Sequence, residues 1–143
     1  MMKVNDILRR KSNQIFAVSP EGTVYDALSL MAEKNLGGVL VMQGDQLNGI
    51  FTERDYARKV ILLGRASKDT PITEVMTAQV RTVSRDTEID ECMKMMTEKN
   101  IRHLPVMENG KVIGLISIGD VVKLLIEEQK GIIEHLQSYI AGQ

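Results

Sequence analysis

The chain is poor in the residues that mark many specialised proteins. Its 143 residues include one cysteine, no tryptophan and 3% aromatic residues, and its net charge is −1. The single Cys92 excludes an intramolecular disulfide and is typical of a reducing compartment, so we expect a cytoplasmic protein. Few aromatics and no excess of basic residues argue against a nucleic-acid partner. No apolar run reaches the roughly 18 residues of a membrane-spanning helix, so no membrane partner is expected.

The patterns of common catalytic sites are missing as well. The sequence has no P-loop and no G-x-G-x-x-G segment, and its histidines are His103 and His135. No histidine and cysteine cluster has the spacing of a metal site. Cys92 falls on the apolar face of an expected helix, which favours a core residue over a nucleophile. We therefore predict that the protein is not an enzyme and has no catalytic residue, metal or catalytic cofactor.

What the chain does contain is an internal duplication. A shift of 65 residues aligns Val18–Tyr56 with Val83–Val121 without a gap. Upstream the match resumes at an offset of 68, so the first repeat carries three extra residues near positions 11–14. Identical pairs include Met31/Met96, Lys34/Lys99, Asn35/Asn100, Val41/Val106, Gly49/Gly114 and Asp55/Asp120. Such a duplication predicts two copies of one structural unit.

Each copy predicts the order β-α-β-β-α after a short lead-in helix. The expected fold is α/β (α+β): two such repeats packed through their sheets with approximate two-fold symmetry, plus an extended C-terminal helix. The repeats span residues 1–66 and 67–128, and the helical extension spans 129–143. Two copies are expected to form one body because a unit of about 60 residues buries only a modest core alone.

Local signals predict the elements of the repeats. Leading strands are expected at Ile15–Val18 and Val80–Val83. Thr23 is placed to cap the long helix of repeat one, and Asp86 or Thr87 that of repeat two. Asn109-Gly110 is typical of a type I′ hairpin turn. The inward face of the second long helix is expected to comprise Ile89, Cys92, Met93 and Met96.

A surplus strip of aliphatic residues occupies the C-terminal helix. It runs through Ile132, Ile133, Leu136 and Ile140, and the first repeat has no equivalent. An apolar strip at a chain end is often a partner surface. We expect a homodimer contact here, with fold-back onto the same chain as the alternative.

The candidate chemistry lies at two strand-to-helix junctions, Gly49–Asp55 and Gly114–Asp120. A helix N-terminus favours anions, and a glycine before it permits the close approach of a ligand. A carboxylate at the end of the first turn accepts hydrogen bonds and suits a vicinal diol. The same Ser/Thr-x-x-Asp pattern also describes a simple helix cap, so binding and capping both remain open for a single copy.

These junctions carry a resemblance to a known family. The G-h-h-[ST]-x-x-D ending, the Leu104-Pro105-Val106 strand and the Val75-Met76-Thr77 lead-in resemble the CBS domain, named after cystathionine β-synthase. The tandem pair resembles a Bateman module, and the resemblance covers nearly the whole chain. It implies that adenine nucleotides bind between the repeats: AMP first, with ADP, ATP, NAD or S-adenosylmethionine as alternatives. It also implies a ribose contact for Asp55 and Asp120, and junction hydroxyls at Thr52 and Ser117.

The resemblance implies further contacts at the start of each hairpin and in each leading strand. Arg102-His103 suits a phosphate, although a solvated arginine and a strand-edge histidine would look the same. Phe16 is expected either beside the base or in the core. The complete set of expected ligand-binding residues is Ile15, Phe16, Ala17, Gly37, Gly38, Thr52, Arg54, Asp55, Val80, Arg81, Arg102, His103, Pro105, Ser117, Gly119 and Asp120.

The function expected from these features is regulatory. The module would sense an adenine nucleotide and act on an unknown regulated protein or through a rearrangement of its dimer. The alternative is a ligand-independent dimerisation or scaffold protein.

Overall fold

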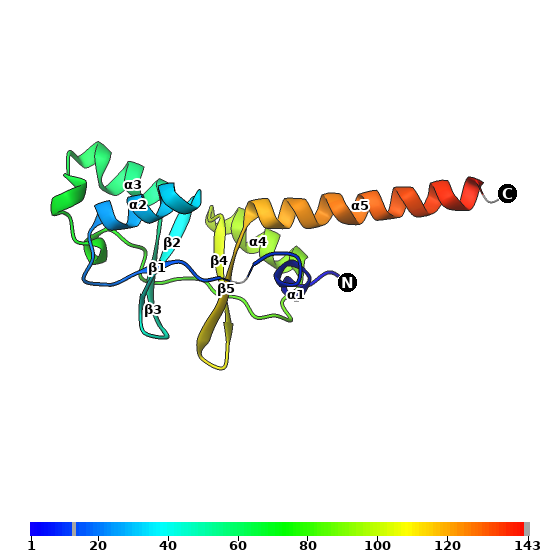
Figure 1. The fold of residues 1–143 in the computed structure, drawn as a ribbon, viewed down its shortest axis with the longest axis horizontal. Coiled ribbons are helices and arrows are strands. Elements are labelled where there is room, and N and C mark those ends of the chain that lie inside the picture. The colour runs from blue at the N-terminus through cyan, green and yellow to red at the C-terminus, as the bar shows by residue number, and fades with distance from the viewer. Residues whose placement is uncertain (13, 142–143) are drawn as a thin grey trace.

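Two small sheets form the centre of the molecule, one from each repeat, and a long C-terminal helix projects from it (Figure 1). The computed structural model describes residues 1–12 and 14–141. Asn13 of the 11–14 insertion and the last two residues of the 129–143 extension lie outside the described residues. The elements are α1 Val4–Leu8, β1 Ala17–Val18, α2 Val24–Lys34, β2 Gly38–Gln43, β3 Gln46–Thr52, α3 Glu53–Lys59, the 3₁₀ turns η1 Ile61–Leu63, η2 Ser67–Asp69 and η3 Ile72–Glu74, α4 Ile89–Lys99, β4 His103–Glu108, β5 Lys111–Ser117 and α5 Ile118–Ala141.

The repeated α/β architecture is confirmed. In repeat one, β1 pairs in parallel with β2, and β2 pairs antiparallel with β3. In repeat two, β4 and β5 form the matching antiparallel hairpin. Asn109 and Gly110 join these strands with φ of 52° and 78°. A type I′ turn requires positive φ at both positions, so the backbone angles agree with the predicted turn.

The predicted strand Val80–Val83 is wrong, and a proline accounts for the difference. Only Val83 pairs with the hairpin, through a single parallel bridge to Val106. In repeat one the Leu40 N–H donates to the Phe16 carbonyl at 3.3 Å, which extends the pairing. The residue equivalent to Leu40 is Pro105, which has no N–H to donate. The leading segment of repeat two therefore stays irregular up to Val83.

The start of α4 also differs from the prediction. Its N-cap is Glu88, with no side-chain hydrogen bond, and not Asp86 or Thr87. The N-terminal segment takes over the capping role, because the Ile89 N–H donates to the Met2 carbonyl at 3.0 Å.

The predicted inward face of α4 is wrong at one position. Met93 is 39% exposed, whereas Ile89, Cys92 and Met96 are buried. The covered face of the helix turns toward Met95, which packs against the cluster that includes α1.

The two lead-in segments pack on opposite repeats. Val4 and Ile7 of α1 belong to the core cluster of repeat two, together with Ile89. Ile72 and Val75, which precede repeat two in the chain, belong to the core cluster of repeat one. Each core is therefore completed by a segment from the other half of the sequence.

A third cluster joins the two sheets. Leu40 and Ile50 of the first sheet pack with Val112 of the second, and Ile15 and Val80 cover this contact. The sheets thus pack against each other, as the duplicated apolar pattern predicted.

The C-terminal helix does not fold back. α5 leaves the body after its first turns and projects into solvent (Figure 1). Leu124 is its last buried residue, and every position from 126 to 141 is exposed. The fold-back alternative is therefore wrong, because the strip around Ile133 lies beyond the reach of the body.

Candidate functional site

The junction of repeat one is closed by its own hydrogen bonds. Thr52 caps α3, and its N–H and Oγ1–H both donate to Asp55 Oδ2, at 3.0 and 3.1 Å. Oδ1 accepts from Thr77 Oγ1 at 3.2 Å and lies 3.1 Å from the Lys59 ammonium. The Asp55 side chain is only 10% exposed. Both of its oxygens are thus used within the chain, so the capping interpretation describes this copy well.

The junction of repeat two is more open. The Ser117 N–H donates to Asp120 Oδ2 at 2.9 Å, and the Asp120 N–H donates to Ser117 Oγ at 3.2 Å. The Lys11 ammonium donates to the same Oδ2 at 2.9 Å and to the Leu115 carbonyl at 3.0 Å. Among the residues that the structure describes, none donates to Oδ1. The Asp120 side chain is 21% exposed, twice the exposed fraction of the Asp55 side chain.

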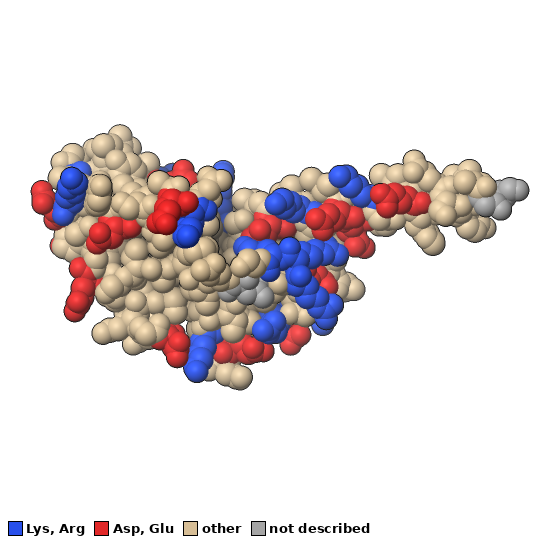
Figure 2. All heavy atoms as spheres, in the orientation of Figure 1, with Lys and Arg blue, Asp and Glu red and all other residues tan. Residues whose placement is uncertain are grey.

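A hollow of about 130 Å³ lies against Asp120. Its cationic lining comes from Arg10, Lys11 and Lys123. Arg10 pairs with Glu127 at 3.1 Å and Lys11 with Asp120 at 2.9 Å, so among the described residues only the Lys123 charge has no ion-pair partner. In Figure 2, Lys and Arg side chains gather beside the first turns of α5. The hollow therefore combines a carboxylate that has a free oxygen with an excess of positive charge.

The lead-in segments pack tightly against the junction glycines. A Cβ on Gly49 would lie 2.7 Å from Met76 Sδ and 2.8 Å from the Thr77 carbonyl oxygen. A Cβ on Gly114 would lie 2.9 Å from Leu8 Cδ2. The lead-in segments thus approach these glycines closely on the side where a Cβ would project.

The His103 ring lies beside Gly37 and Gly38. A Cβ on either glycine would lie 3.5 Å from the His103 ring. Burial lowers the pKa of His103, and nearby Lys11 and Arg102 act in the same direction. Asp120 and Glu53 oppose this shift but do not overcome it. The imidazole is therefore neutral near pH 7, able to form a hydrogen bond but not a positive contact for phosphate.

The remaining charged candidates lie on the surface. Arg102 is exposed at the start of β4, and its carbonyl accepts from the Ile118 N–H at 2.9 Å. Arg54 donates from Nη1 to the Asn100 carbonyl of repeat two. Arg81 and Gly119 are exposed, whereas Pro105 is buried within β4. Arg54 thus bridges the two repeats in this structure.

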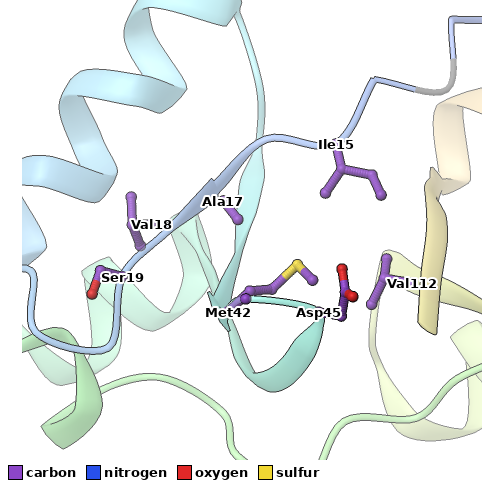
Figure 3. Close-up of a pocket in the computed structure, with 8 residues that line it drawn as sticks. Ile15, Ala17, Val18, Ser19, Met42, Asp45 and Val112 are labelled. Carbon is purple, nitrogen blue, oxygen red and sulfur yellow. The ribbon is translucent and has the colours of Figure 1, made fainter. Parts of the chain in front are cut away.

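The residues expected beside a base are divided between two environments. Ile15 and Ala17 line a second hollow, of about 380 Å³, near the tip of the β2–β3 hairpin. In Figure 3, Ile15 lies across from Met42 and Asp45, with Val112 of the second sheet beside them. The junction acids do not line this hollow, and Asp45 is the one charged residue that does. Among the described residues, its lining therefore has no cationic side chain to pair with a phosphate.

The other two candidates of the leading segments lie elsewhere. Phe16 is partly buried, outside the core clusters, and the Lys34 ammonium lies 5.5 Å from its ring centroid. Val80 packs on the cluster between the sheets. The core interpretation of Phe16 is therefore wrong, and its contact with a base stays a prediction.

Sequence reasoning missed two residues at the junctions. Lys11 bonds Asp120 and Thr77 bonds Asp55, although each comes from the lead-in of the other repeat. Lys11 lies in the insertion that breaks the alignment of the repeats, which was the available signal. Within residues 1–12 and 14–141, no group of histidine, cysteine and acidic side chains is arranged to hold a metal. No helix in the same ranges is both long and apolar enough to cross a bilayer.

Comparison with known proteins identifies both repeats. The CBS domain model matches residues 4–61 and 72–127. The mitochondrial CBS domain-containing protein CBSX3 of Arabidopsis thaliana is 37% identical, over 97% of this chain and 72% of its own length. A solved signal-transduction protein with CBS domains from Burkholderia ambifaria is 53% identical with a TM-score of 0.86, and the match covers 90% of this chain and 96% of that one.

A more distant structure adds ligands to the comparison. The CBS domain pair of protein MJ0100, solved with 5′-methylthioadenosine and S-adenosylmethionine, has a TM-score of 0.76 at 24% identity. That match covers 87% of this chain and 99% of the other, and it shows the shared fold. With two matched repeats that account for most of its length, the chain belongs to the CBS-domain family.

Proposed function

We propose that this protein is a regulatory module that binds an adenosyl ligand at the junction of repeat two. The observation that carries the proposal is Asp120, whose Oδ1 accepts no hydrogen bond from the described residues and borders a cationic hollow. A carboxylate oxygen of this kind accepts a hydrogen bond from a ribose hydroxyl. Asp55 has no such oxygen to offer, so its junction is the weaker candidate.

The charges around Asp120 favour a ligand that carries an anionic group. The ribose hydroxyl bonds Oδ1, while Lys11 keeps Oδ2 and, with Lys123, neutralises a nearby phosphate or carboxylate. AMP supplies this anionic group with a single phosphate. ADP, ATP, NAD and S-adenosylmethionine share its adenosyl group. The two ligands of the MJ0100 pair also share that group, which supports the ligand class.

The role that follows is regulatory and not catalytic. A ligand that binds one conformation more tightly shifts the population toward it. Because Lys11 and Asp120 come from opposite ends of the chain, a ligand at this point acts on the contact between the lead-in of repeat one and α5. That change passes to a regulated protein or to a second copy of this chain.

A ligand-independent scaffold is the second candidate. It is favoured by the Lys11–Asp120 ion pair, which satisfies the junction without a ligand, and by the exposed α5. A direct measurement of ligand binding distinguishes the sensor from the scaffold.

Titration calorimetry with AMP, ADP, ATP, NAD and S-adenosylmethionine tests the proposal. We expect Asp120→Ala to weaken the best ligand by about tenfold or more, since a hydrogen bond to a charged group contributes about 1.5–3 kcal/mol. Asp26→Ala is the matched control, because Asp26 forms the same capping box with Thr23 on α2, away from the hollow. It should lower stability comparably and leave binding unchanged.

Each remaining outcome separates the candidates. If Asp55→Ala abolishes binding while Asp120→Ala does not, the site has been assigned to the wrong repeat. If no ligand of the panel binds the wild-type chain, the scaffold function replaces the sensor.

A further inference from the structure

The outer two thirds of α5 have no partner within the described chain. Every residue from 126 to 141 is exposed, and Ile133, Leu136 and Ile140 are 53%, 54% and 69% exposed. An isolated helix shorter than about 12–15 residues is marginal in water, and most helical stability in proteins comes from packing of an apolar face. The projecting segment is of similar length, so its stability calls for a surface that covers this stripe.

The stripe has the spacing of a two-stranded coiled coil. From Val122 to Ile140, successive positions of the stripe are separated alternately by four and three residues. This is the a/d pattern of a heptad. Isoleucine occupies all three a positions, and a leucine occupies the last d position. β-Branched residues at a with leucine at d favour parallel dimers. The seam consists of Val122, Ile126, Gln129, Ile133, Leu136 and Ile140.

The charges of the helix suit pairing with its own copy. Glu127, Glu128 and Glu134 fall at the b and c positions, away from the seam. The positions that flank the seam carry lysine or glutamine on one side, at 123, 130 and 137, and apolar residues on the other, at 125, 132 and 139. Two such helices therefore bring no acidic groups together, and the lysine stems cover apolar neighbours.

Gln129 distinguishes the two orientations of such a pair. In an antiparallel coil a d residue faces an a residue of the partner, so Gln129 would be buried against isoleucine. In a parallel, in-register coil Gln129 faces its own copy and the two amides bond each other, as a single polar core residue does when it fixes register.

We propose that α5 pairs with α5 of a second copy of this chain in a parallel two-stranded coiled coil. The body does not obstruct the seam, because Val121 and Leu124 attach α5 to it while Val122 and Ile126 remain 47% and 48% exposed. In Figure 1 the outer part of α5 extends clear of both repeats. The two bodies lie at the same end of the coil, which gives the module a fixed dimer.

Sedimentation equilibrium of the full chain at micromolar concentration tests the pairing. We expect the wild type to be a dimer and the double variant Ile133→Asp/Leu136→Asp to be a monomer with an unchanged body, judged by near-native circular dichroism. Ser138→Asp is the matched control, because it adds a carboxylate to the same segment on the outward face, and it should remain dimeric. A monomeric wild type overturns the proposal, as does a double variant that stays dimeric.

Cross-linking tests the orientation. Ile126→Cys and Leu136→Cys are oxidised separately, with the wild type, whose Cys92 is buried, as the control. A parallel in-register coil links both variants into covalent dimers. An antiparallel coil can place only one of these two positions against its own copy, so cross-linking of just one overturns the parallel arrangement. The cross-linking result does not depend on ligand binding. If the pairing proposal fails, the proposed function is still tested by calorimetry.

Discussion

At the residue scale, His103 couples the two repeats. Its ring packs against Gly37 and Gly38 of repeat one, while its strand belongs to repeat two. The charged groups that act on it also come from both repeats: Glu53 from one, and Arg102 and Asp120 from the other, with Lys11 of the lead-in. Because burial dominates, the folded protein resists protonation of this imidazole.

The lowered pKa of His103 predicts that stability falls as the pH is reduced. Below about 6.5 the unfolded histidine binds a proton that the folded one does not, so the free energy of unfolding decreases down to the folded pKa. We expect the urea midpoint to fall between about pH 7.5 and pH 5.5, and His103→Gln to reduce that difference. His135→Gln removes the exposed histidine of α5 and should keep the wild-type difference. An equal pH dependence in all three proteins would contradict the assignment to His103.

At the scale of single elements, each strand-to-helix junction is also a packing site for a lead-in segment. The Ile50 N–H donates to the Thr77 carbonyl at 3.0 Å, and the Thr77 N–H donates back to Ile50 at 2.8 Å. These bonds hold the chain against Gly49. In repeat two a Cβ on the corresponding glycine, Gly114, would meet only the end of the Leu8 side chain among the described residues.

This difference predicts unequal effects of the same substitution. Gly49→Ala forces a Cβ against the Thr77 carbonyl oxygen, which is fixed backbone, and should cost about 1–3 kcal/mol of stability. Gly114→Ala should cost less, because the Leu8 methyl group can move. Thermal or urea unfolding of the two variants gives the comparison. A larger loss at Gly114 would show that the backbone contact at Gly49 relaxes more easily than a buried leucine.

At the scale of the whole molecule, the two halves of the sequence are not two independent bodies. Helix α1 completes the core of repeat two, and the η3 segment with Val75 completes that of repeat one. Folding of either core therefore requires chain from the other half, which makes one cooperative unit the expected behaviour.

Cutting the chain between the repeats tests this exchange. Fragment 1–66 lacks Ile72 and Val75, so we expect it to have little helical circular dichroism and poorly dispersed amide resonances. Fragment 67–143 lacks α1 and should behave similarly. Mixing the two fragments should restore the native spectrum, because each then supplies the missing segment. Native-like structure in 1–66 alone would contradict the exchange.

Much of the fold follows from short-range patterns. The 65-residue repeat predicted two equivalent units, and Thr23, Thr52 and Asn109-Gly110 predicted two helix starts and one turn that the structure confirms. These features are determined by the sequence itself because a cap or a type I′ turn depends on a few neighbouring residues. The absence of the leading strand at Val80 was also encoded, in the missing N–H of Pro105.

The candidate site was decided by tertiary structure. The sequence offered Asp55 and Asp120 as equivalent acids, but Thr77 and Lys59 occupy the free oxygen of one, whereas Lys11 bonds only Oδ2 of the other. Lys11 and Asp120 are 109 residues apart, so no local pattern relates them. The sequence thus determined that there are two junctions of one family. The Lys59 contact lies within α3, but only the packing of the lead-in segments brought Thr77 to Asp55 and Lys11 to Asp120. Tertiary structure therefore decided which carboxylate keeps an oxygen without a donor among the described residues, because hydrogen-bonding capacity depends on which atoms the folded chain brings within reach.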